Sequence, residues 1–495
     1  MKIKSPNALP VVALVLLGLL IFFVGLAASY TFIDEVYFAD PVINFLTGHS
    51  YATTAWNVTG QFETHVSSAP AYSLLLLLWL KIFGITQTAV RSLPAVLALG
   101  SAVVFWRACL RSGLIKSGGA GAIVICVVLL DYGYAFAYTC GRPDPLSALL
   151  MSAMFYFFSL QNKRAAFGAI GVIALLLPFV QWGCVIYLFL LSVALLFISP
   201  KKFLPYVVVA GAGAGAGLLI QKAAYVHFGI WDTWMNTVKS EGSGNLASRI
   251  ENRMTWDALL HHHSNTIPKD FSVLVILAGL ACIYLWSRLR QRQHEARPAR
   301  SAWIIAVVVS AGMFLVGKFP TYYGWMLCFP LAAVLGIYFD QALVENRMNA
   351  KIAVVIAVLA CSVGLPLQIG LAAHDWKDHN PAAITAWLGP KISTNDVVYC
   401  DYPFYFIAKE RAGQVFAGRY FNLLTPKDFN RITLVIFGKN GSDWNPSTHP
   451  LTNATVVGNW TSSRSDILGN DWKYGFLSAP NYDCTVYRLK EPMKP

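Results

Sequence analysis

The chain has 495 residues, of which 56% are hydrophobic and only 13% are charged, and its formal net charge is +13. Soluble domains carry about 25% charged residues, so this composition excludes an ordinary soluble protein and indicates a polytopic membrane protein. The basic excess lies before residue 374, as the positive-inside bias of membrane proteins predicts. Basic residues do not interleave with aromatic ones as in a nucleic-acid groove, so we expect no nucleic-acid partner.

A helix needs about 20 apolar residues to cross a bilayer. The run at 70–84 is apolar but short, and we interpret it as a juxtamembrane or re-entrant helix. Counting it as a span would place the most basic loop, 288–300, outside, whereas leaving it out places that loop and the N-terminus inside. The charge distribution therefore predicts about eleven spans, at 9–31, 88–110, 119–138, 146–160, 165–180, 182–199, 203–222, 271–288, 302–318, 322–343 and 352–373.

Three regions then face outward: loop 32–87, loop 223–270, and the polar tail that follows the membrane domain 1–373. The tail, 374–495, reads as a small α/β domain, because short β-branched and aromatic runs alternate with turn residues. We expect strands within 396–408, 432–438, 454–460 and 484–490. The glycine-rich run 211–217 lies inside a span, so it indicates close helix packing and not a phosphate-binding loop.

Asp34 and Glu35 follow the first apolar segment directly. Two carboxylates at a membrane surface are costly unless they are solvated, paired or used. One interpretation is an ordinary solvated loop start. The other is a catalytic site in which one carboxylate acts as a general base, its pKa tuned by partial desolvation and nearby cations.

Gly141-Arg142-Pro143-Asp144-Pro145 forms the next outward loop. It is either a structural turn closed by a salt bridge or a second part of the same site. In the second case Asp144 would support Asp34 or orient an acceptor. Arg142 would then either neutralise a phosphate or hold the carboxylates in place.

Further cations are candidates on the same side. Lys318 ends a span, where a lysine commonly snorkels to the interface or binds a lipid phosphate. His65 is either a loop histidine or a ligand. Tyr322, Tyr323 and Trp325 are interpreted as interfacial aromatics.

The remaining titratable and sulfur-containing groups give fewer leads. Asp131 is the main charge inside a predicted span, where it could cap the outer end. The nine cysteines show no metal-ligand spacing, so we expect no metal site. Cys400 and Cys484 lie in the polar tail, where a disulfide and two buried free thiols on neighbouring strands both remain open.

These motifs together resemble the GT-C superfamily of membrane glycosyltransferases, in the branch of protein mannosyltransferases and lipid A aminoarabinose transferases. The shared pattern is an acidic pair after the first span, a Pro-aromatic juxtamembrane helix ending in Phe-Gly, an Arg-containing span, an Arg-Pro-Asp element and a late Lys-x-x-x-Tyr. In this chain the pattern falls on Asp34-Glu35, 70–84, Arg91, Arg142-Pro143-Asp144 and Lys318 to Tyr322. The aminoarabinose transferases open the juxtamembrane helix with Lys-Pro, where this chain has Ala69-Pro70.

The resemblance implies an inverting glycosyltransferase with a polyprenyl-phosphate-linked sugar donor and a glycan, lipid or protein acceptor. It implies Asp34, Glu35 and Asp144 as catalytic residues. It implies a second set of residues as ligands of the donor phosphate: Arg142, Lys318, Arg249, His65 and Tyr322. No cofactor, metal or nucleotide-binding fold is expected, because the leaving group is a lipid monophosphate. The resemblance also implies that the protein lies in a bacterial inner membrane, with its site and tail on the periplasmic side.

Two other classes are weighed against this one. A transporter or flippase for a lipid-linked saccharide would favour inverted repeats and charged residues within spans, of which only Asp131 stands out. A structural scaffold would leave the acidic loops on one face unexplained.

Overall fold

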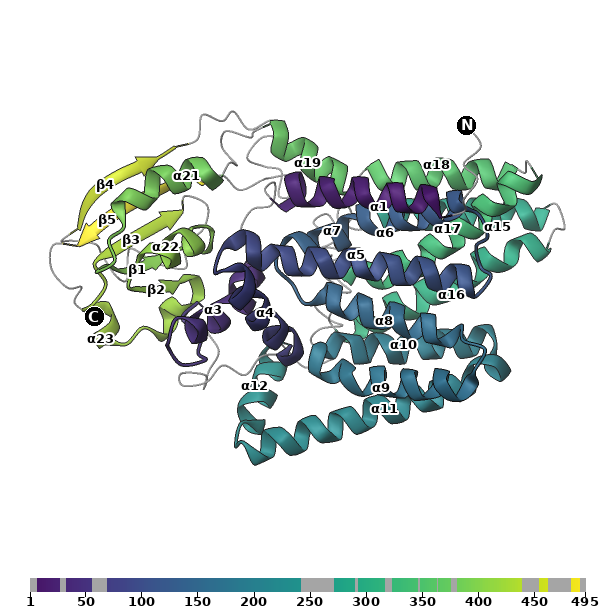
Figure 1. Ribbon diagram of the computed structural model, residues 1–495, viewed down its shortest axis with the longest axis horizontal. Coiled ribbons are helices and arrows are strands. Elements are labelled where there is room, and N and C mark those ends of the chain that lie inside the picture. The colour runs from purple at the N-terminus through teal and green to yellow at the C-terminus, as the bar shows by residue number, and fades with distance from the viewer. Residues whose placement is uncertain are drawn as a thin grey trace.

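The computed structural model describes residues 7–26, 33–55, 69–241, 271–289, 293–316, 323–345, 348–362, 364–374, 381–438, 454–461 and 482–489. A long helical bundle forms most of the molecule, and a small sheet domain built from the tail covers one end of it (Figure 1). Helices α3 (Ile33–Leu46) and α4 (Pro70–Phe83) lie between the two parts. This is the predicted polytopic helical fold with a C-terminal α/β domain.

The helices of the bundle follow the predicted apolar segments closely. They are α1 (Ala8–Leu20) with a π-helical continuation (Ile21–Gly25), α5 (Gln87–Arg111), α6 (Gly118–Leu130), α7 (Tyr132–Thr139), α8 (Asp144–Phe158), α9 (Lys163–Val180), α10 (Trp182–Ile198), α11 (Pro200–His227), α15 (Phe271–Leu289), α16 (Gln293–Val316), α17 (Trp325–Glu345), α18 (Met348–Ser362) and α19 (Leu365–His374). Helix α12 (Trp231–Glu241) follows α11 outside the bundle. Side-chain caps fix several starts, such as that of α5, where Thr86 accepts from the Ala89 amide.

Length and composition alone qualify four of the described helices as membrane spans, or five if the bent pair α6–α7 is one span. Shorter apolar helices, among them α8, α10 and α17, make up much of the remaining bundle. The number of eleven spans therefore stays a prediction.

The span predicted at 119–138 is wrong as a single helix. It is two helices, α6 and α7, which meet at Asp131 with a bend of 61°. The Asp131 backbone leaves the helical region, and its side chain accepts a hydrogen bond of 2.9 Å from the Tyr134 amide. Asp131 thus caps the start of α7 instead of the outer end of a continuous span, and its buried carboxylate has a hydrogen-bond donor.

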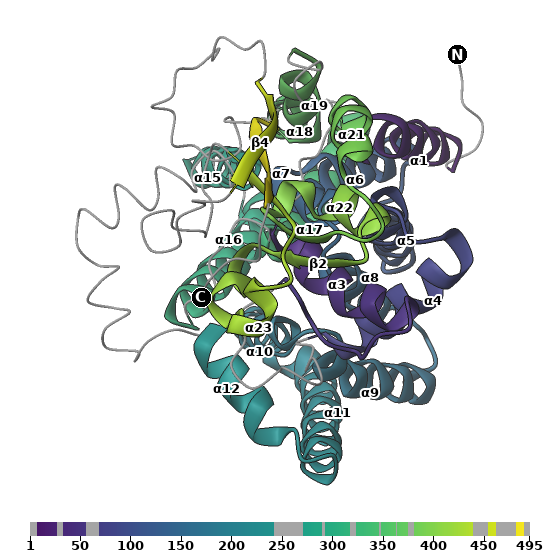
Figure 2. The same cartoon turned by 90° about the vertical axis from the view of Figure 1, so that its left-hand side faces the viewer.

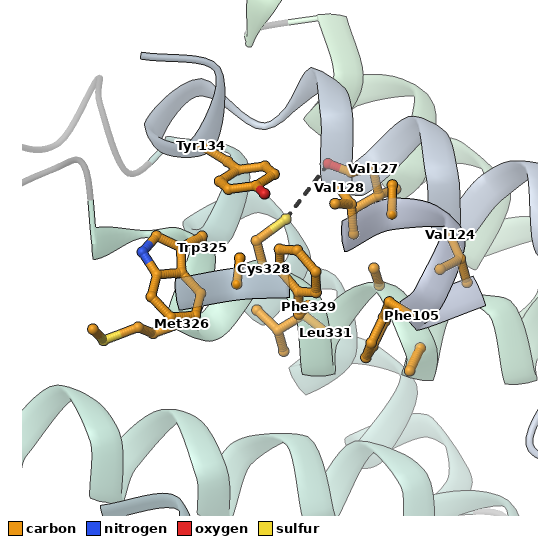
Figure 3. Close-up of a cluster of buried hydrophobic side chains, with 14 of the residues drawn as sticks. Phe105, Val124, Val127, Val128, Tyr134, Trp325, Met326, Cys328, Phe329 and Leu331 are labelled. Atoms are coloured by element: carbon orange, nitrogen blue, oxygen red, sulfur yellow. Dashed lines mark hydrogen bonds between the residues drawn. The ribbon is translucent and has the colours of Figure 1, made fainter. Parts of the chain in front are cut away.

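The interior of the bundle is packed with large apolar side chains from α5, α6, α7 and α17 (Figure 3). Phe329 contacts the rings of both Phe105 and Tyr134, at centroid distances of 5.0 and 5.3 Å. The Cys328 thiol donates to the Val127 carbonyl. This packing holds the start of α17 against the start of α7, close to the acidic loop residues.

Helices α9 and α11 approach closely at two glycines of the run 211–217. A Cβ atom on Gly213 would lie 2.4 Å from the Gly171 carbonyl oxygen, and one on Gly217 would lie 2.2 Å from the Leu175 carbonyl oxygen. Gly211 and Gly215 face open space. The expectation of close helix packing is therefore confirmed for alternate glycines of the run.

We expect Gly217→Ala to destabilise the protein by about 1–3 kcal/mol, because the added methyl group collides with backbone and forces α9 and α11 apart. Gly215→Ala is the matched control, since a methyl group there meets nothing within 4 Å. Thermal unfolding of the two purified variants in detergent compares them. Equal midpoints would show that the two helices do not pack as described.

The tail forms a five-stranded mixed sheet in the order β2-β1-β3-β5-β4. Its strands are β1 (Val397–Cys400), β2 (Gln414–Ala417), β3 (Leu434–Gly438), β4 (Ala454–Trp460) and β5 (Cys484–Leu489). Strand β1 is parallel to β2 and β3, whereas β3–β5 and β5–β4 are antiparallel. Helices α21 (Pro381–Leu388), α22 (Tyr405–Arg411) and α23 (Pro426–Phe429) accompany the sheet (Figure 2).

The strand predicted across 396–408 is correct only in its first half. The chain turns after Cys400 and enters α22 at Tyr405. Pro403 lacks the amide that a continuing ladder needs, and Asp401 stabilises the turn by accepting from the Gly438 amide at 2.6 Å. This turn points α22 toward the membrane part of the protein.

Cys400 and Cys484 are free thiols in the structure. They lie on β1 and β5, which are not neighbours, because β3 is paired between them. Two strand spacings amount to about 10 Å, whereas a disulfide needs Cα atoms within about 7 Å. The disulfide is therefore wrong, and the alternative of two buried free thiols is correct except that their strands are not neighbours.

Candidate functional site

Asp34, Arg142 and Asp144 meet in one cluster at the end of the bundle covered by the tail. Asp34 lies in the first turn of α3, and Asp144 lies in the first turn of α8. The Arg142 guanidinium forms ion pairs with both: Nη1 contacts Asp34 Oδ2, and Nε donates to Asp144 Oδ2 at 2.8 Å. The sequence prediction that the two acidic loops form one site is consistent with this geometry.

The three side chains differ sharply in access to solvent. The Asp34 side chain is 22% exposed, whereas those of Arg142 and Asp144 are 3% and 0% exposed. Asp144 Oδ1 also accepts a hydrogen bond from Trp325 Nε1 at 3.4 Å. A molecule arriving from outside the cluster could therefore reach Asp34, with the buried pair behind it.

Glu35, the next residue of α3, forms a second ion pair with a different arginine. Arg91 of α5 donates from Nε to Oε1 at 2.8 Å and from Nη2 to Oε2 at 2.9 Å. Its Nη1 donates to the Leu26 carbonyl at 2.8 Å. Both side chains are buried, so this fork-to-fork pair ties the start of α3 to α5 and to the end of the first span.

Gly141 lets the acidic loop approach α3 closely. Its φ is +66°, in the left-handed region that favours glycine, and a Cβ there would lie 2.9 Å from Cγ of Glu35. The Gly141 carbonyl accepts a hydrogen bond of 2.8 Å from the hydroxyl of Tyr72 on α4. The predicted juxtamembrane helix therefore contacts the site through its first turn.

A series of side-chain hydrogen bonds runs from the helix that carries Asp144 further into the bundle. Ser147 of α8 hydrogen-bonds to Gln181 at the start of α10, and Gln181 donates to the hydroxyl of Tyr323 at 3.2 Å. The interpretation of Trp325 as an interfacial aromatic is wrong, because it is 1% exposed and its indole donates to the buried Asp144 carboxylate. For Tyr323, which is half-buried, it stays a prediction. A sequence cannot distinguish a helix end that faces lipid from one that faces a polar interior.

The other predicted phosphate-binding residues, Lys318, Arg249, His65 and Tyr322, lie outside the described residues. Within the described part of the chain, no three His, Cys, Asp or Glu side chains are placed to hold one metal ion.

Asp40, which the sequence analysis missed, joins α3 to the tail. Its buried carboxylate accepts a hydrogen bond of 2.6 Å from the hydroxyl of Tyr405 on α22, and the Lys409 ammonium lies 4.0 Å away. The hydroxyl of Thr53 and the backbone amide of Thr54 also donate to it. Burial lowers the pKa of Lys409, and the Asp40 charge opposes that shift. Asp40 follows Asp34 by six positions on the same helix, so this contact affects the position of the partly exposed Asp34 carboxylate.

We expect Asp40→Asn to loosen the tail from α3, because it removes the charge that the Tyr405 hydroxyl and the Lys409 ammonium face. Hydrogen exchange of the α22 amides should rise in this variant. Asp428→Asn is the control, since among the described residues its carboxylate accepts from Thr425 alone, in a local capping box on the same domain. Unchanged α22 protection in Asp40→Asn would contradict the role given to this contact.

Comparison with solved structures shows that the fold of the whole chain is a known one. The apo crystal structure of ArnT from Cupriavidus metallidurans superposes with a TM-score of 0.54 at 13% identity, over 96% of this chain and 97% of that one. The chain has the ArnT fold. The crystal structure of the same enzyme bound to undecaprenyl phosphate matches with a TM-score of 0.50 at 14% identity, over 98% of this chain and 99% of that one.

A weaker likeness extends to the apo oligosaccharyltransferase of Archaeoglobus fulgidus, with a TM-score of 0.46 at 12% identity, over 88% of this chain and 70% of that one. No protein-family model matches the chain, and no curated protein matches it significantly. The fold that the short motifs implied is confirmed by the superposition on apo ArnT.

Proposed function

We propose that the protein is an inverting glycosyltransferase that moves a sugar from a polyprenyl-phosphate donor to an acceptor outside the cytoplasm. The observation that carries the proposal is the ion pairing of Asp34. Its partly exposed carboxylate is held by Arg142, which also binds the buried Asp144 carboxylate. The fold shared with ArnT supports it, since one of those structures holds undecaprenyl phosphate.

In the proposed step the Asp34 carboxylate takes the proton from an acceptor hydroxyl or amine. The acceptor's oxygen or nitrogen forms a bond to the anomeric carbon from the face opposite the leaving group. The bond between that carbon and the phosphate oxygen breaks, and the lipid monophosphate departs with the electron pair. Inversion of the anomeric configuration follows from this single displacement.

Arg142 suits positioning better than phosphate binding. Its side chain is 3% exposed, and its two ion pairs are with carboxylates. We therefore assign it to holding Asp34 and Asp144, and we assign Glu35 with Arg91 to anchoring α3. Asp144 is assigned to positioning: it is buried, Trp325 donates to it, and it holds the Arg142 side chain that binds the proposed base, Asp34. Lys318, Arg249 and His65 remain the proposed cations for the departing phosphate.

The direct test offers the purified protein a panel of radiolabelled polyprenyl-phosphate sugars together with envelope glycan, lipid and peptide acceptors. Protein-dependent appearance of label in an acceptor, with release of the lipid phosphate, is the expected result. In sealed vesicles a flippase would instead move the labelled lipid across the bilayer without breaking the bond. That outcome would overturn the proposal in favour of transport.

The proposed orientation makes a separate prediction. A reporter that is active only outside the cytoplasm should be active when fused after residue 250 or 373 and silent after residue 295, since the basic loop 288–300 is expected inside. Activity at 295 would mean that 70–84 crosses the bilayer. The acidic loops and the tail would then not share the predicted face.

A further inference from the structure

A groove lies at the end of the bundle away from the tail, outside the site described above. It encloses about 490 Å³, a volume typical of small-ligand sites. Its lining comes from the last turn of α10, the second half of α15 and the middle of α16: Phe197, Tyr284, Arg300, Trp303, Ile304, Val307 and Val308. Helix α10 starts at the site, where Gln181 meets Ser147, so its last turn is about 25 Å away.

The α16 side of the groove is a single helical stripe. Arg300, Trp303, Ile304, Val307 and Val308 follow the i, i+3, i+4, i+7, i+8 pattern of one helix face. Ala299, Ala302, Ala306 and Val309 are buried on the opposite face, against the bundle. The inward face is already packed, and Trp303, Ile304 and Val308 of the outward stripe are only half-buried, so part of their apolar surface remains for a partner other than this chain. Val307 is 56% exposed.

One end of the stripe is cationic, and the rest is apolar. Arg300 is exposed and forms no ion pair with any described carboxylate. Arg288, also exposed, places its guanidinium 5.8 Å from the centre of the Tyr284 ring, which lines the groove. From Arg300 to Val308 the helix rises about 12 Å, enough to follow the upper part of an acyl chain.

We propose that this groove binds one anionic phospholipid of the leaflet at that end of the bundle, with its phosphate on Arg300 and Arg288 and an acyl chain along Trp303, Ile304 and Val307. Basic pockets between membrane helices are suited to phospholipid head groups, and a tryptophan beside the cation suits the interface. Inorganic phosphate would use the cations but leave the apolar stripe unfilled. The proposal does not depend on the glycosyltransferase assignment.

The test is native mass spectrometry of delipidated protein titrated in detergent with phosphatidylglycerol or, separately, phosphatidylcholine. Phosphatidylglycerol should be retained preferentially, and Arg300→Gln should weaken its binding roughly fivefold, the effect expected of one basic residue. Arg164→Gln is the control, because Arg164 is an exposed cation at the start of α9 that does not line the groove. Equal retention of the two lipids, or an equal loss in the Arg164 variant, would overturn the proposal.

A second variant tests the apolar part. Val307→Asn keeps both arginines and changes an exposed side chain, so folding should be retained and is checked by thermal unfolding. It should weaken phosphatidylglycerol binding while leaving any binding of inorganic phosphate unchanged. If inorganic phosphate binds the wild-type protein as tightly as the phospholipid, or if Val307→Asn binds the lipid normally, the groove is not a phospholipid site.

Discussion

Replacing Asp34 with asparagine should lower the rate of sugar transfer roughly 10²–10⁴-fold, the range that a general base contributes. Asparagine keeps the size of the side chain but cannot take the acceptor proton. Donor binding should stay near the wild-type level, because the proposed phosphate ligands are elsewhere. Single-turnover transfer and equilibrium binding of the same labelled polyprenyl-phosphate sugar separate these two effects.

Two controls sharpen this result. Glu35→Gln should reduce transfer less, since Glu35 is buried against Arg91 and does not face the accessible side of the cluster. Asp34→Asn should also retain the wild-type unfolding midpoint to within a few degrees, because Asp34 is the partly exposed member of its ion pair. Wild-type turnover by Asp34→Asn would remove Asp34 from the mechanism.

Replacing Arg91 with methionine should destabilise the protein by about 3–5 kcal/mol, the largest stability effect expected of a single change here. It leaves the fully buried Glu35 carboxylate without the two hydrogen bonds of its arginine partner. It also removes a donor to the Leu26 carbonyl. Thermal unfolding in detergent measures the loss.

The double variant Glu35→Gln with Arg91→Met is the informative companion. Removing both charges should recover a large part of the lost stability, because an unpaired buried charge costs more than an absent pair. If the double variant is as unstable as Arg91→Met alone, the cost comes from packing around α5 and not from the stranded carboxylate.

The sequence predicted the parts of the site that follow from local order and sidedness. Asp34 and the Arg142-Asp144 loop were placed together because each follows a span on the same predicted side. Partners set by tertiary packing were not visible: Glu35 and Arg91 are 56 positions apart, and Asp40 and Tyr405 are 365 apart. A buried carboxylate and a loop carboxylate look alike in a sequence, so Asp40 gave no signal.

The errors in the element assignments have local causes. The break at Asp131 depends on one side chain capping a helix inside an apolar run, which hydropathy averages away. The turn after Cys400 interrupts a run rich in strand-forming aromatics, and only Pro403 signals it. Trp325 was assigned to the interface because aromatic residues near span ends usually lie there, whereas here packing turns it toward Asp144.

The bond between Tyr405 and Asp40 has a consequence for how the protein is made. Helix α3 is among the first segments to emerge from the ribosome, yet its partners on α22 are synthesised 365 residues later. Domains generally fold as units in order of synthesis, and contacts distant in sequence form late. Until the tail has been delivered and folded, the Asp40 carboxylate has its local donors, Thr53 and Thr54, but lacks Tyr405 and Lys409. A chain truncated before α22 could therefore insert its helices but would lack the contacts from the tail that help to position Asp34, its proposed base.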